Sequence, residues 1–256
     1  MTTPAAGAAA ANSNPYGLMA ALHQGGVIAW SVFIILVIMS AATWYIMFTK
    51  LIEQQKVLNQ AKRVRTNFWG TPTIRDGVNK LEKNSAYRQI VDDGLLAQEQ
   101  HTKLIDPVDQ HEWLLGSLSR STAAINSKLG TGLAVLATVG STAPFVGLFG
   151  TVIGIYRALI KIGAAGQASI DAVAGPVGEA LIMTALGLIV AVPAVLGYNW
   201  LVRRNKVVAE QIGVFANDLH GYMVSNGAVR PLLVSAKAAT PVPPVKTGSA
   251  AINPKA

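Results

Sequence analysis

The fold of this chain is decided by the stretch Leu129–Tyr156, which reads LGTGLAVLATVGSTAPFVGLFGTVIGIY. The stretch contains no charged residue and lies between Lys128 and Arg157. A helix needs ~20 apolar residues to cross a hydrocarbon core of ~30 Å. The stretch therefore predicts a membrane-spanning helix, because the chain offers no large polar domain that could bury it.

Two further stretches have the same character. Val27–Phe48 and Ala180–Val202 also contain no charged residue. Trp30, Trp44 and Tyr45 lie near the ends of the first of them, where interfacial aromatic side chains gather. The whole chain is 51% hydrophobic and only 13% charged, whereas soluble domains carry about 25% charged residues. We therefore predict an all-α membrane protein with three transmembrane helices and long cytoplasmic helical extensions.

The basic residues predict how the chain is oriented. Of 21 Lys and Arg residues, 12 lie between Lys50 and Lys128, and 7 follow Trp200. Only Arg157 and Lys161 fall on the other side of a three-span arrangement. Cytoplasmic loops carry an excess of Lys and Arg. We therefore expect the section after the first span and the C-terminus to be cytoplasmic, and the N-terminus to lie on the opposite side of the membrane.

These patterns divide the chain into consecutive segments. We expect a flexible N-terminus (1–26), transmembrane helix 1 (27–48), a cytoplasmic helical section (49–128), transmembrane helix 2 (129–156), a short connection (157–179), transmembrane helix 3 (180–202), a cytoplasmic amphipathic helix (203–230) and a disordered tail (231–256).

The cytoplasmic section is expected to be helical throughout. Leu51–Phe68 extends the first span, a further helix covers Ile74–Lys103, and Gln110–Lys128 leads without interruption into the second span. After the third span, apolar residues recur at three- and four-residue spacing, which predicts an amphipathic helix. Its apolar face needs a cover, either the cytoplasmic section or a neighbouring subunit. The apolar residues of this helix are Val208, Ile212, Phe215, Leu219 and Met223.

Several kinds of chemistry are absent from the sequence. There is no cysteine, which excludes disulfides, zinc–thiolate sites and iron–sulfur clusters. The four histidines are scattered and lack the spacing of metal ligands. The glycine-rich second span lacks the Lys-Ser/Thr ending of a phosphate-binding loop, and no Gly-x-Ser-x-Gly elbow is present. We therefore expect no enzymatic activity, no metal site and no cofactor.

Small residues in the spans predict close helix packing. Gly150 and Gly154 form a small-xxx-small pair, which lets two helix backbones approach in lipid. Pro144 removes a backbone donor and favours a kink. The third span carries a face of small residues within about 80° of arc. These are Thr184, Gly187, Ala191 and Ala194.

Four threonines are polar groups at membrane depth: Thr138, Thr142, Thr151 and Thr184. On a straight helix at ~100° per residue, Thr151 lies on the opposite side from Thr138 and Thr142. A threonine hydroxyl can bond to its own helix, hold water or bond to a carboxyl group. It does not titrate near neutral pH. Threonine alone therefore cannot carry a proton charge across a membrane.

Glu179 is the one ionisable residue that adjoins a span from within the expected helix. One interpretation is a functional intramembrane carboxylate. The other is that Pro176 and Gly178 open the third helix, so that Glu179 lies in its first turn, where the helix dipole favours a negative charge. Both remain open. A single carboxylate at the edge of a span is too little to carry protons across the membrane. We therefore expect a partner to supply the titrating acid.

Three segments carry a resemblance to a known family: Ser141–Gly154 (STAPFVGLFGTVIG), Glu179–Gly187 (EALIMTALG) and Ala191–Asn199 (AVPAVLGYN). They resemble the MotA/TolQ/ExbB proton-channel family, most closely its ExbB members. One departure is that members commonly show Ala-Pro-Gly before the glutamate segment, whereas this chain has Ala174-Gly175-Pro176.

The resemblance implies a complex in the bacterial inner membrane, with a periplasmic N-terminus and a cytoplasmic C-terminus. Several copies of the chain, five by this resemblance, would form a ring around a pore. ExbD-like single-span partners would supply a membrane aspartate, and a TonB-like protein would carry energy to outer-membrane receptors for iron–siderophores and similar cargo. The pore threonines of the family correspond to Thr151 and Thr184, its glutamate to Glu179 and its helix-three proline to Pro193.

Three alternatives remain. A TolQ-like subunit of the Tol–Pal system would use the same mechanism for envelope integrity. A passive membrane scaffold would need only the small-residue faces. A nucleic-acid partner would rest on the net charge of +8 alone. The acidic residues interspersed between Glu53 and Glu112 argue against a compact basic stripe, so we expect no nucleic-acid binding.

Overall fold

The computed structural model describes residues 18–105, 108–165 and 170–231. In these ranges the chain is helical and contains no strand. The elements in chain order are α1 (Leu18–Arg63), a one-turn π-helix (Val64–Phe68), α2 (Ile74–Asn79), α3 (Ala86–His101), α4 (Gln110–Gly130), α5 (Leu133–Ala165) and α6 (Ile170–Val224).

Some predictions fall outside the described residues. They concern the lead-in before Leu18, the middle of the connection between the second and third spans, and the tail after Pro231. The helix α6 begins at Ile170, so the interpretation that Pro176 and Gly178 open the third helix with Glu179 in its first turn is wrong. The surroundings of the Glu179 side chain and of residues 174–176 are outside the described part.

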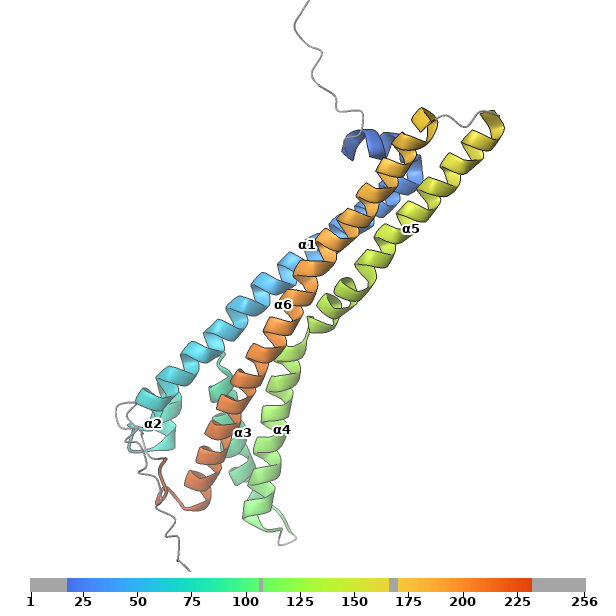
Figure 1. The fold of residues 1–256 in the computed structure, drawn as a ribbon. Helices are drawn as coiled ribbons and strands as arrows, with labels where there is room; N and C mark the ends of the chain where they lie inside the picture. The colour runs from blue at the N-terminus through green and yellow to red at the C-terminus, as the bar shows by residue number, and fades with distance from the viewer. Residues whose placement is uncertain (1–17, 106–107, 166–169, 232–256) are drawn as a thin grey trace, which may run out of the picture.

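Three helices are long and apolar enough to cross a membrane. They comprise most of α1, α5 with the preceding α4, and most of α6. This confirms the predicted all-α fold with three helices suited to spanning a bilayer. In Figure 1 the molecule is an elongated bundle in which α1, α5 and α6 run together at one end. Around the opposite ends of α1 and α6 lie α2, α3 and α4.

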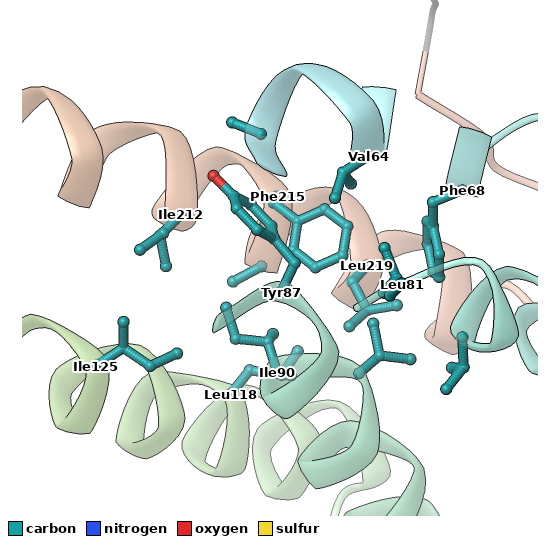
Figure 2. Close-up of a cluster of buried hydrophobic side chains, with 14 of the residues drawn as sticks. Val64, Phe68, Leu81, Tyr87, Ile90, Leu118, Ile125, Ile212, Phe215 and Leu219 are labelled. Carbon is teal, nitrogen blue, oxygen red and sulfur yellow. The ribbon is translucent and has the colours of Figure 1, made fainter. Parts of the chain in front are cut away.

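A hydrophobic core holds the end of the bundle that contains α2, α3 and α4 (Figure 2). Phe215 of α6 packs against Tyr87 of α3 and Phe68 of the π-helix, with ring centroids 5.1 and 5.5 Å apart. The expected apolar face of α6 is buried here at every position from Val208 to Met223. Its cover is therefore the section between the first two spans of the same chain, which answers the question that the sequence left open.

The prediction of an uninterrupted helix from Gln110 into the second span is wrong. The helix α4 ends at Gly130 and α5 begins at Leu133. Between them Gly132 has a φ of +86°, in the left-handed region that glycine enters without a steric penalty. The chain therefore turns at this glycine before it enters the apolar half of the bundle.

The predicted helix over Ile74–Lys103 is also wrong, because residues 80–85 divide it into α2 and α3. Ser85 caps the second of these helices, since its hydroxyl accepts a hydrogen bond from the backbone N–H of Arg88 at 3.0 Å. Serine is a favoured N-cap because its oxygen satisfies an otherwise unbonded N–H of the first turn.

At the other end of the bundle the helices are longer than expected. The helix α1 begins at Leu18, within the predicted flexible lead-in, and departs from helical geometry only at Gly26 (φ 59°, ψ −149°). The helix α5 continues to Ala165, because the residues after Arg157 remain mostly apolar. The described parts of the lead-in and of the connection are thus helical.

Tyr87 lies at the centre of the hydrophobic core with 1% of its surface exposed (Figure 2). Its hydroxyl has no hydrogen-bond partner among the residues that the structure describes. Burial raises the pKa of Tyr87 to about 12, because the anion would lose its hydration. The ring therefore stabilises the core, whereas the hydroxyl opposes it.

We predict that Tyr87→Phe leaves stability unchanged or raises it by about 1 kcal/mol, because it removes a buried polar atom without a partner. Tyr87→Ala should cost about 3–5 kcal/mol through the cavity it leaves. Because the folded pKa exceeds the unfolded one, wild type should lose stability relative to Tyr87→Phe as the pH rises from about 10 to 12. Thermal unfolding followed by circular dichroism tests these expectations. A large loss in Tyr87→Phe would mean that the hydroxyl has a stabilising partner.

Candidate functional site

The helices α5 and α6 touch backbone to backbone at two glycines. A Cβ atom added to Gly147 would lie 2.6 Å from the carbonyl oxygen of Met183, and one added to Gly187 would lie 2.7 Å from that of Ala143. Real Cβ atoms essentially never come so close. Any side chain at either position would push the two helices apart. Gly187 was predicted as a packing residue, whereas Gly147 was not singled out.

The other predicted packing residues surround this crossing. Gly150 faces both neighbours, since a Cβ there would lie 3.2 Å from Met183 of α6 and 3.3 Å from Val32 of α1. Pro144 borders the contact, with its Cα 3.3 Å from a Cβ built on Gly187. Two other predicted residues lie further from the crossing: Gly154 lines a cavity next to α1, and Pro193 is half-buried within α6.

One turn from the crossing, the two predicted pore threonines meet. The hydroxyl oxygens of Thr151 and Thr184 lie 3.0 Å apart. Thr151 is buried and also lies 2.7 Å from the carbonyl oxygen of Leu148. Each hydroxyl has one proton, so both protons are used when Thr151 donates to Leu148 and Thr184 donates to Thr151. The oxygen of Thr184 keeps its acceptor lone pairs in this arrangement.

The two other threonines named above in the second span do not join this pair. Thr138 and Thr142 are exposed, and their hydroxyls bond to carbonyl oxygens of their own helix, those of Ala134 at 2.9 Å and of Thr138 at 2.7 Å. The helix α5 is continuous through Pro144. Only Thr151 is therefore brought against α6, as the helical positions predict.

The threonine pair can bind a hydrogen-bonding group but cannot ionise near neutral pH. The three apolar stretches contain no charged residue and no histidine. Among the described residues, no group of three His, Cys, Asp or Glu side chains could hold a metal ion. What this part of the bundle offers is an uncharged wall with two adjacent hydroxyls.

Outside this wall, α5 and α6 present large apolar side chains that no part of the described chain covers. Such a surface needs lipid or other apolar protein around it. On the two helices together it includes Phe145, Phe149, Val152, Leu188, Ile189, Val192 and Leu196.

Sequence reasoning missed a pair of hydrogen-bonded amides beyond the apolar half, of which Gln54 is buried and Asn205 is half-buried. Gln54 of α1 is fully buried, and its Nε2 donates to the side-chain oxygen of Asn205 in α6 at 2.6 Å. The Nδ2 of Asn205 in turn donates to the carbonyl oxygen of Leu129 at 3.0 Å. The pair joins α1, α6 and the end of α4. No local pattern marks it, because its members lie far apart in the chain.

We predict that Asn205→Ala destabilises the protein by about 1–3 kcal/mol, because it removes one hydrogen bond of the buried Gln54 and the side-chain donor to the Leu129 carbonyl. Thermal unfolding of the purified protein measures the effect. Asn199→Ala is the matched control, since Asn199 is an exposed amide on the same helix, and surface changes usually stay within about 0.5 kcal/mol. Equal unfolding temperatures for the two variants would contradict the prediction.

Comparison with known proteins places the chain in a family. Residues 82–213 match the MotA/TolQ/ExbB proton channel family. A biopolymer transport protein ExbB of Xanthomonas campestris pv. campestris is 41% identical over 248 residues, covering 87% of this chain and 97% of the relative. One of Neisseria gonorrhoeae is 37% identical over 204 residues, covering 77% and 93%.

A more distant relative is a Tol-Pal system protein TolQ of Haemophilus influenzae, which is 30% identical over 208 residues, covering 76% of this chain and 88% of the relative. The family match includes both threonines and both glycines of the α5–α6 crossing. The chain belongs to the MotA/TolQ/ExbB proton channel family.

Proposed function

We propose that this chain is the proton-channel subunit of a bacterial inner-membrane complex that uses the proton motive force to energise TonB-dependent uptake. An ExbD-like single-span protein is its partner in this proposal, and a TonB-like protein passes the energy to outer-membrane receptors for iron–siderophores and similar cargo. The family membership and the higher identity to relatives named ExbB than to those named TolQ support this choice.

The main structural support for this proposal is the contact between Thr151 and Thr184. It places two hydroxyls 3.0 Å apart in a wall without charged side chains. Proton transfer needs a group that titrates, and the described wall has none near neutral pH. The acid must then come from another chain, and an aspartate in a partner's membrane helix satisfies this requirement. Glu179, directly before the third apolar stretch, is a second acidic group along the same proposed path.

The half-buried Thr184 is the hydroxyl that a partner can reach. A protonated carboxyl group would donate to its oxygen while Thr184 donates to Thr151. Low polarity favours the neutral carboxyl, whereas contact with water favours the anion. The threonine wall would thus hold the partner's acid in its neutral form and release it where water enters.

The assembly and its orientation are part of the same proposal. The exposed apolar faces of α5 and α6 suit a ring of five copies around the partner helices, with lipid outside. The clustering of basic residues after the first and third spans supports a periplasmic N-terminus and a cytoplasmic C-terminus.

We predict that Thr151→Val and Thr184→Val each lower energised uptake about tenfold or more, the effect expected when a hydrogen bond worth roughly 1.5–3 kcal/mol to a charged or reacting group is lost. Valine keeps the shape of threonine without the hydroxyl, so membrane insertion and assembly should persist. Uptake of siderophore-bound iron by cells that carry each variant as their only copy measures the effect.

Thr138→Val is the matched control, because this exposed hydroxyl bonds only within its own helix. It should retain wild-type uptake, and Thr151→Ser should recover much of the activity lost in Thr151→Val. Wild-type uptake in both valine variants at positions 151 and 184 would refute the assignment of this pair.

Two competing functions predict different results. A TolQ-like subunit would protect the envelope, so deletion would cause detergent sensitivity while growth on scarce siderophore iron continues. A passive scaffold would keep its function after the proton gradient is collapsed with an uncoupler. The proposed subunit instead loses uptake when the gradient is collapsed, and it copurifies with a single-span protein that has an aspartate in its span.

A further inference from the structure

A basic cavity of about 350 Å³ lies between the kinked start of α1 and the C-terminal end of α5. Its lining residues are glycine or aliphatic, except for Arg157 and Lys161. These two cations lie four residues apart on α5, which places them on the same face of the helix one turn apart. The cavity therefore combines two positive charges with an apolar wall.

The guanidinium of Arg157 is fixed at this cavity. Its Nη1 donates to the carbonyl oxygen of Gly25 at 2.7 Å. Gly26 departs from helical geometry, and an interrupted helix leaves backbone carbonyls of the preceding turn to be bonded by other groups. A guanidinium has five N–H donors, so the bond to Gly25 positions the group without using up its capacity to bind an anion.

A separate apolar groove of about 460 Å³ lies next along α1 and α5, and Ile28 lines both the groove and the cavity. The groove is formed by Val32 and Ile35 on α1 and by Phe145 and Phe149 on α5, among others. It ends near Thr142. From Arg157 to this residue the helix rises roughly 22 Å at ~1.5 Å per residue, which is about the length of an extended lipid acyl chain.

We propose that an anionic phospholipid occupies this site, with its phosphate at Arg157 and Lys161 and an acyl chain in the groove between α1 and α5. Phosphate forms strong charge-assisted hydrogen bonds with guanidinium and ammonium groups. Arg157 is the first charged residue after the second apolar stretch, so it lies at the level where lipid headgroups meet the hydrocarbon. The lipid belongs to the leaflet on the side where α5 leads toward α6.

A phospholipid fits better than the other occupants that the chemistry allows. A free phosphate ion would use the cations but leave the apolar groove without a cover. A second copy of this chain would have to present an acidic group at one end of an apolar helix of matching length. One lipid molecule supplies a negative charge for the cavity and an apolar chain for the neighbouring groove.

We predict that the full-length protein, reconstituted with its natural partners in bilayers of phosphatidylglycerol and phosphatidylethanolamine, retains phosphatidylglycerol when it is released for native mass spectrometry. Arg157→Gln with Lys161→Gln should lower this retention about thirtyfold, since each of the two basic residues near a membrane surface contributes roughly 1 kcal/mol to binding of anionic lipid. Lys62→Gln with Lys83→Gln removes the same charge from exposed positions outside the spans and should retain the wild-type level.

A second variant tests the groove while both cations remain. Ser31→Phe places a large ring in the groove and should also lower lipid retention, whereas excess inorganic phosphate should not displace the lipid. A photo-crosslinking residue in place of Phe149 should form an adduct with lipid. Equal retention in the Arg157/Lys161 variant and the lysine control, displacement by inorganic phosphate, or an adduct with a second copy of the chain would each overturn the proposal.

Discussion

The backbone contact of α5 and α6 at Gly147 and Gly187 is the constraint on which the site depends. Within a bilayer, helices gain little from hydrophobic burial and associate through close packing and interhelical hydrogen bonds. With hydrogen atoms as the only side chains, the two backbones approach so closely that threonine hydroxyls one turn away meet at 3.0 Å. Moving the helices apart by ~1 Å would stretch that contact beyond hydrogen-bonding distance.

The two halves of the molecule face different solvents and are held by different forces. Around Tyr87 and Phe215, aromatic and aliphatic side chains form a core, in which burial of each large side chain contributes about 1.5–3 kcal/mol. In the apolar half, close backbone packing joins α5 to α6, whereas α1 touches α5 near Gly150 and leaves a groove and a cavity beside this contact. The apolar lining of these spaces suits an apolar occupant.

The sequence was sufficient to predict what depends on periodicity and on runs of uncharged residues. The three apolar helices and the buried face from Val208 to Met223 follow from such patterns, whereas Thr151 and Thr184 were chosen among the threonines through the family resemblance. The turn at Gly132 and the division of the section between the first two spans by residues 80–85 do not, because a glycine or a cap acts only where the surrounding packing requires a turn. The Gln54–Asn205 contact was equally hidden, since it joins residues that only the folded bundle brings together.

Continuity of the helices determines how the two halves are connected. The helix α6 runs without a break from Ile170 to Val224, so Thr184 and Phe215 lie roughly 46 Å apart on one rod at ~1.5 Å per residue. Gln54 and Asn205 join α1 to this rod near the boundary of the halves. The chain also passes between the two halves from α4 to α5, and there the turn at Gly132 separates the two helices. The helix α6 therefore links the threonine pair directly to the hydrophobic core around Phe215, whereas α5 is joined to α4 only through the turn at Gly132.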